Sequence, residues 1–147
     1  MCSQNWGDQP FFDNVASWYF GHGRLGEYSI VWFDFLGLDG IEHVSAYAAT
    51  NGRIITASCK AGSAKVRPIG VNDDYPPTVT SGDPDGFAVV FDLEGGGMLN
   101  VNVTVINIIG EAATLYTRFA GSMIGSLNGG KLIEGGVALF EQFKLTE

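Results

Sequence analysis

Short turn signals recur along this chain at intervals that leave room for β-strands and for little else. At several points a glycine follows an aspartate, an asparagine or another glycine, and these combinations favour tight hairpin turns. They are Asp39-Gly40, Asn51-Gly52, Asp85-Gly86, Gly95-Gly96-Gly97 and Asn128-Gly129-Gly130. No segment between them shows the apolar period of a helix over a helical length. The chain is therefore expected to be all-β.

The segments between the turns have the alternation and composition of strands. Strands are predicted at 15–22, 28–36, 43–50, 53–59, 64–71, 87–93, 98–108, 114–124 and 136–143. Short strands at this spacing are typical of an antiparallel barrel or sandwich. We expect one domain over 1–147, with about eight to ten strands closed into a barrel. The least regular stretch, 72–84, contains two consecutive prolines and is predicted to be an exposed loop.

Composition and charge exclude several classes of protein. With 46% hydrophobic residues, the chain of 147 residues is too apolar to be disordered. Its net charge is −8 and its eight basic residues do not cluster. Neither a nucleic acid nor an anionic membrane surface is therefore an expected partner. The apolar runs are too short to span a bilayer, so no membrane insertion is expected.

Two further features concern the cellular compartment. The first residues lack the charged-then-apolar order of a secretion signal. The only cysteines, Cys2 and Cys59, are not at metal-ligand spacing and are expected to be thiols in a reducing compartment. We therefore expect a cytoplasmic location.

Aromatic residues gather on the first two predicted strands. Alternation places Trp18 and His22 on one face of the first strand, and Tyr28 and Trp32 on one face of the second, with Asp34 at its far end. If residues 23–27 form the connection, His22 lies opposite Tyr28 and Trp18 opposite Trp32. The sequence then predicts one aromatic wall inside the barrel, suited to an apolar small molecule. The alternative is that these side chains are ordinary core residues that bind no ligand.

The motifs that suggest a cofactor or a metal do not have the required context. Gly21-His22-Gly23-Arg24-Leu25-Gly26 matches the dinucleotide fingerprint, but a strand rather than a helix follows it. Asp83-Pro84-Asp85-Gly86 is an incomplete calcium loop and is interpreted as a solvated turn. Neither a nucleophile with a local base nor a metal-ligand motif is present in the sequence. We expect no cofactor, no metal and no covalent catalysis. Arg118 shares a face with Tyr116 and is expected at the surface; the alternative is an inward position, which would need an anionic partner or ligand.

Two stretches resemble a known family. Gln4-Asn5-Trp6-Gly7 is similar to the Asn-Trp-Gly segment of the hydroxyneurosporene-synthase-like (AttH-like) proteins, and the stretch 17–34 resembles the Trp-x-x-Gly-His strand pair of their second domain. Within this superfamily the resemblance points to the fungal Diels–Alderases that form decalin rings. It implies a lipocalin-like barrel equivalent to the C-terminal one of two domains. The usual lead-in before Asn-Trp-Gly is missing.

The resemblance implies a cofactor-independent pericyclase that folds a linear polyene from a polyketide or nonribosomal peptide pathway for [4+2] cyclisation. Such a reaction needs positioning rather than a nucleophile, a metal or a redox group. The residues expected to bind substrate are Asn5, Trp6, Trp18, His22, Tyr28 and Trp32; no catalytic acid or base is assigned.

Three other questions stay open at this point. The alternatives to a pericyclase are a lipocalin-like carrier of an apolar molecule and a carotenoid-type hydratase. A second barrel domain or a homodimer is expected to complete the site. The chain itself is a piece of a longer protein, a stand-alone homologue that pairs with itself, or a remnant without activity.

Overall fold

The structure, a computed structural model, describes residues 8–147 and is an antiparallel β-barrel with almost no helix. The strands are β1 (Val15–Leu25), β2 (Tyr28–Gly37), β3 (Glu42–Thr50), β4 (Arg53–Ser58), β5 (Ala64–Ile69), β6 (Gly86–Asp92), β7 (Met98–Ala112), β8 (Tyr116–Leu127) and β9 (Ile133–Lys144). A single 3₁₀ turn, Phe11–Asp13, precedes them in the described part of the chain. Every predicted strand is present, and the largest difference is at β7, which continues past 108. The all-β prediction is confirmed.

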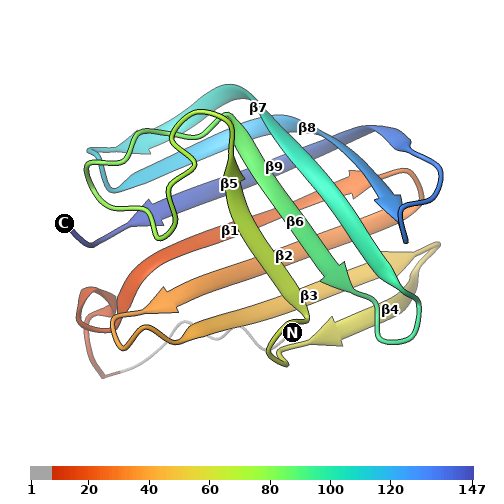
Figure 1. The fold of residues 1–147 in the computed structure, drawn as a ribbon, viewed down its shortest axis with the longest axis horizontal. Coiled ribbons are helices and arrows are strands. Elements are labelled where there is room, and N and C mark those ends of the chain that lie inside the picture. Colours follow the sequence, from red (N-terminus) through yellow and green to blue (C-terminus); the bar gives the residue numbers. More distant parts are fainter. Residues whose placement is uncertain (1–7) are drawn as a thin grey trace.

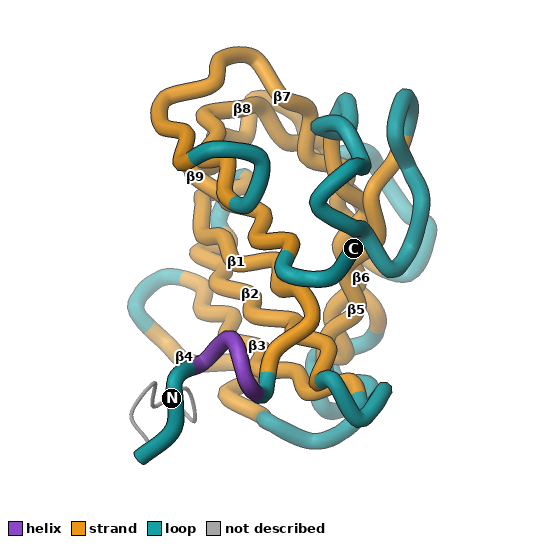
Figure 2. Tube along the Cα trace, turned by 90° about the vertical axis from the view of Figure 1, so that its left-hand side faces the viewer, coloured by secondary structure: helices purple, strands orange, loops and turns teal. Residues whose placement is uncertain are grey.

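All nine strands form one sheet that curls over on itself. The order is β4-β3-β2-β1-β9-β8-β7-β6-β5, and every neighbouring pair is antiparallel. In Figure 1, β5, β6 and β7 cross over β1, β2 and β3, so the two ends of the sheet form facing layers. Figure 2 shows the same curl from the side, with the long loops at the ends of the strands.

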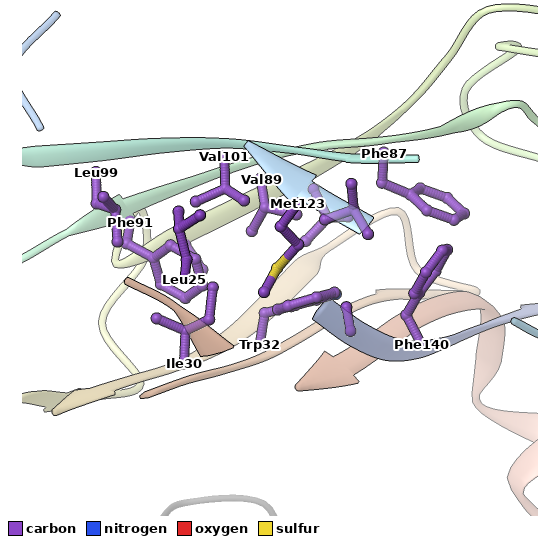
Figure 3. Close-up of a cluster of buried hydrophobic side chains, with 14 of the residues drawn as sticks. Leu25, Ile30, Trp32, Phe87, Val89, Phe91, Leu99, Val101, Met123 and Phe140 are labelled. Atoms are coloured by element: carbon purple, nitrogen blue, oxygen red, sulfur yellow. The ribbon is translucent and has the colours of Figure 1, made fainter. Parts of the chain in front are cut away.

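The space between the layers is a packed apolar core. Figure 3 shows Trp32, Ile30 and Phe140 on one side of it, facing Met123, Val89 and their neighbours on the other. Trp32 is 1% exposed. The barrel interior was predicted to hold a ligand. The protein's own side chains fill its apolar part instead. Close packing of this kind is the ordinary state of protein interiors.

The predicted register of the first hairpin is wrong. The turn between β1 and β2 contains only two residues, so Leu25 pairs with Tyr28, His22 with Val31, and Trp18 with Phe35. The predicted connection of 23–27 would have paired His22 with Tyr28. The real register differs by an odd number of residues, and such a shift moves side chains to the opposite face of a sheet. Trp18 and Trp32 consequently lie on opposite faces, and the single aromatic wall does not exist.

Gly21 and Gly23 both lie in β1, although Gly23 was predicted to lie in the connection 23–27. Gly21 pairs with Trp32, and a Cβ added to Gly21 would lie 2.1 Å from Cζ2 of the indole. Gly23 likewise faces the Met123 side chain, 2.5 Å from such an added atom. A strand glycine often marks a close approach by another group. Here the large core side chains occupy the space that side chains at these two positions would need.

Candidate functional site

The predicted binding residues divide between the two faces of the sheet. Trp18 and His22 alternate outward on β1, whereas Tyr28 and Trp32 point inward on β2 and are buried. Asn5 and Trp6 lie outside the described residues. The structure therefore does not bring the predicted set together, and any substrate contact of these residues stays a prediction.

A groove does exist, on the outer face of the sheet. It has a volume of about 700 Å³ and is lined by residues of β1, β2, β3, β7, β8 and β9. Its floor is a row of residues that are paired strand by strand. In order across the sheet they are Tyr47, Val31, His22, Leu139, Ala120 and Asn107. Among the residues predicted to bind substrate, His22 is the one that lines this groove.

The groove combines an apolar floor with a few polar side chains. Val137 and Leu139 contribute apolar surface that is 63% and 37% exposed. Arg24, two residues from His22 on β1, and Asn107, on β7, are among the groove's polar lining residues. An apolar concave surface with a few polar groups is the usual composition of a small-molecule site. Its open apolar surface also suits contact with a second protein surface.

Irregularities in β7 shape one rim of the groove. The ladder between β7 and β8 shifts between Val105 and Asn107 and again between Ile108 and Gly110. These bulges leave Ile106, Ile108 and Ile109 about half exposed or more. A bulge redirects side chains and bends its strand. In β7 the first shift pairs Asn107 with Ala120 and brings Asn107 into the groove lining, whereas alternation from Val105 would have placed it on the inner face.

An aromatic patch continues the outer face beside the groove. The Trp18 ring lies 4.5 Å from the Phe143 ring, 5.6 Å from that of Phe11 and 6.0 Å from that of Phe33, measured between ring centroids. The indole N–H of Trp18 has no hydrogen-bond partner. Together with the exposed aliphatic residues of the groove, this patch makes the outer face unusually apolar. Tyr116 and Arg118 lie on the same face of β8, as predicted.

A charged cluster, in which Asp34 is buried and Arg67 and Glu42 are partly exposed, joins β5 to β2 and β3. The Asp34 carboxylate accepts the backbone N–H of Val66 at 2.8 Å and lies 3.4 Å from Arg67. Arg67 also binds Glu42 with two nitrogens, at 2.6 and 3.1 Å. The guanidinium lies 3.8 Å above the Tyr75 ring, whose hydroxyl donates to Glu42. This is a fork-shaped, charge-assisted arrangement.

Burial changes the acidity of this cluster. Loss of water raises the pKa of Asp34 to about 7, and the neighbouring Glu42 acts in the same direction, while the Val66 N–H opposes the rise. The hydrogen bond from Arg67 lowers the pKa of Glu42. Burial raises the pKa of Tyr75 to about 12 and also raises that of Tyr19. The cluster thus holds a carboxyl group that gains or loses a proton near neutral pH.

Two findings concern metals and cysteines. Within 8–147, no group of three or more metal-ligating side chains comes together. Cys59 is disulfide-bonded, so the expectation of a thiol at this position is wrong.

Within the described part of the chain there is also no helix with the length and apolarity needed to cross a membrane. A cytoplasmic location stays a prediction.

No protein-family model matches the chain. Two curated proteins are similar to the chain. The quinolone epoxide rearrangement protein penF of Penicillium thymicola is 38% identical over 141 residues, which is 96% of this chain and 38% of that protein. The corresponding protein asqO of Emericella nidulans is 39% identical over 141 residues, 95% of this chain and 38% of its own length. This chain is similar over nearly its whole length to quinolone epoxide rearrangement proteins. It spans less than two fifths of theirs.

Solved structures confirm the fold. CghA has a TM-score of 0.71 at 12% identity, with 94% of this chain and 42% of CghA covered. The structure of CghA with Sch210972 gives 0.69, with 92% and 42% covered. An AttH-type protein of Nitrosomonas europaea gives 0.62 at 14% identity, with 97% and 42% covered. The barrel is lipocalin-like, as the resemblance implied.

Sequence reasoning missed most of the groove. Leu139 and Asn107 lie far along the chain from His22, and only the ladders through β9 and β8 connect them. Alternation could have placed Leu139 on the exposed face of its strand. Nothing in the sequence gives the register that brings it beside His22.

Proposed function

We propose that this chain is a domain of a cofactor-independent enzyme that rearranges or cyclises a small-molecule secondary metabolite, with a quinolone epoxide as the substrate class. The observation that carries the proposal is the identity of 38–39% with the two quinolone epoxide rearrangement proteins over 141 residues. It favours a rearrangement over the [4+2] cyclisation of a polyene that the first family resemblance implied. The likeness to CghA supports the fold alone.

The groove on the outer face is the proposed substrate site. Its apolar floor around Val31 and Leu139 would hold a fused-ring substrate, and His22 would contact the polar part. An isomerisation can be accelerated by holding one reactive conformation, since positioning alone supplies up to about 7–11 kcal/mol in favourable cases. A hydrogen-bond donor at the oxygen that develops charge adds electrostatic stabilisation. The imidazole of His22 is the proposed donor.

A second protein surface is proposed to cover this groove. The chain spans 38% of the length of its curated relatives, and its outer face leaves Val137 and Ile106 more than 60% exposed. An apolar face of this kind is normally covered in a stable protein. We assign that role to the rest of a longer chain, such as a further barrel domain; pairing of two copies is the alternative that the experiment separates.

The test is turnover of a quinolone epoxide, followed by liquid chromatography with mass spectrometry against the uncatalysed reaction. The chain is assayed alone and together with the remaining domain of a relative such as asqO. A linear polyenoyl tetramate is assayed in parallel as the [4+2] substrate. We expect rearrangement of the epoxide, faster with the added domain. Conversion of the polyene alone would replace the proposal by a pericyclase.

A pair of histidine variants tests the site. His22→Ala removes the groove histidine, whereas His43→Ala removes an exposed histidine that stacks on Phe35 at a centroid distance of 4.7 Å, away from the groove. We expect a loss of about 10²-fold or more in turnover for His22→Ala, a typical size for a lost proton donor, and no change for His43→Ala. Tight binding without turnover would make the protein a carrier instead.

A further inference from the structure

The lining of the outer groove includes one arginine, Arg24 on β1. Its exposed side chain lies on the same face of the strand as His22. In the part of the chain that the structure describes, Arg24 forms no ion pair and no side-chain hydrogen bond. By contrast, Arg67 binds Glu42 at 2.6 Å. A guanidinium in a protein stays charged, so the groove holds a positive charge that no ion pair neutralises.

Two neighbouring rows of paired residues cross the groove, and neither row contains an acid. The first is the row through His22 given above. The second consists of Ser29, Arg24, Val137, Ser122 and Thr104, each paired with the next in the sheet. Ser29 and Val137 line the groove on the two sides of Arg24. The ladder neighbours of the arginine are therefore a hydroxyl group and an apolar group rather than carboxylates.

Three carboxylates lie on the nearest stretches of chain, and none of them forms an ion pair with Arg24. They are Glu27, Glu134 and Glu141. Glu27, in the turn after β1, accepts the side-chain amide of Asn51 at 3.4 Å. Glu141, beyond the His22 row, accepts the Tyr116 hydroxyl at 2.8 Å. Although the whole chain has a net charge of −8, this end of the groove presents a cation to any ligand that enters it.

We propose that Arg24 is a specificity-determining residue of the groove and binds an anionic oxygen group at one end of the ligand. The donors of a guanidinium form a fixed fork that matches the two oxygens of a carboxylate. Because two residues of a strand span about 7 Å, this anion would lie about that distance from the group that His22 contacts. The inference rests on the proposed function of the groove. It adds that the substrate class carries an anionic oxygen, such as a carboxylate or an ionised ring hydroxyl.

The position of Arg24 beside apolar surface distinguishes it from an ordinary surface arginine. A fully solvated ion pair contributes little to binding. Val137, which pairs with Arg24, is 63% exposed. The rings of a ligand that covers Val137 would also keep water away from the guanidinium. Charges attract each other more strongly where water is excluded, so the apolar and the ionic contacts support each other.

Calorimetric titration with 2-naphthoate tests the proposal, with 2-naphthamide as a neutral ligand of nearly the same shape. We expect the unaltered chain to prefer the naphthoate by about fivefold, the upper end for an exposed ion pair. Arg24→Gln should remove this preference. Arg24→Lys should keep part of it, because the charge remains but the fork is lost. Lys65→Gln removes one charge from an exposed position on β5 outside the groove and should leave the preference unchanged.

Two further measurements separate ligand binding from a structural role of Arg24. Raising the ionic strength from about 0.01 M to about 1 M should weaken the preference for naphthoate in the unaltered chain, and should have no such effect in Arg24→Gln. In a nuclear magnetic resonance titration, naphthoate should shift the backbone amide signals of Arg24, Ser29 and Val137. These signals report on the groove directly.

The outcomes of these experiments separate this inference from the proposed function. Equal affinity for naphthoate and naphthamide, absence of naphthoate binding, or a preference that persists in Arg24→Gln would overturn the inference. Signal shifts confined to residues outside the groove would overturn it as well. A naphthoate preference that depends on Arg24, in a chain that does not turn over the epoxide, would support the inference and count only against the proposed function. Epoxide turnover without a naphthoate preference would do the reverse.

Discussion

The carboxylate of Asp34 on β2 accepts the backbone N–H of Val66 on β5 at 2.8 Å. The two strands are not neighbours in the sheet, whose order runs from β4 to β5 without a ladder between its ends. This bond and the contacts of Arg67 with Asp34 and Glu42 therefore hold the facing layers together through side chains. Removing one partner of such a buried pair leaves the other uncompensated.

Asp34→Asn should flatten the pH dependence of stability. Burial raises the pKa of Asp34 from its ordinary value of 3.8 to about 7 in the folded protein. The stabilisation from this retained proton is complete below the ordinary pKa and is lost as pH rises through the folded value. Urea denaturation across this range should show a fall in the free energy of unfolding that is smaller in the variant. Asp73→Asn, in an exposed loop, is the control; equal slopes would contradict the prediction.

Gly21→Val should destabilise the barrel because its side chain would collide with the Trp32 indole. Overpacking in a core costs about 1–3 kcal/mol. Gly110→Ala is the matched control, because the nearest atom to an added Cβ there is 3.8 Å away. Chemical denaturation measures both. A Gly21→Val protein as stable as the control would show that the close approach between β1 and Trp32 is not as described.

Trp32→Ala and Trp18→Ala should differ in their effect on stability. Trp32 is 1% exposed in the core, and truncation of a buried aromatic costs about 3–5 kcal/mol. Trp18 packs on the outer face against Phe143 and Phe33, so its loss should cost less. Thermal and urea unfolding of both variants makes the comparison. Equal losses would contradict the assignment of the two tryptophans to opposite faces.

The chain alone should self-associate through its apolar outer face. Val137→Glu with Leu139→Glu places charges on the groove floor and should lower the association measured by light scattering during size-exclusion chromatography. Val71→Glu, at a loop residue that is 62% exposed, should leave association unchanged. A chain that is monomeric at every concentration, or a double variant that associates like the parent, would contradict this prediction.

The positions of the strands could be predicted because their signals are local. Asn51-Gly52 and Asp39-Gly40 lie in turns, with positive φ at Asn51, Gly52 and Gly40. Alternation along β2 correctly placed Tyr28 and Trp32 together on one face. Alternation along β8 likewise placed Tyr116 and Arg118 on one face. These features depend on neighbours within a few residues, and the sequence displays those directly.

Which faces meet was decided by the tertiary structure. A two-residue turn in place of a five-residue one changes the register of β1 against β2 by an odd number, and this reverses the face on which His22 stands relative to Tyr28. Gly21 and Gly23 have no room for a side chain because Trp32 and Met123 fill the space beside them. Alternation, a property of one strand, determined which residues share a side. The groove and the Asp34–Val66 contact depend on register and closure, which only long-range packing sets.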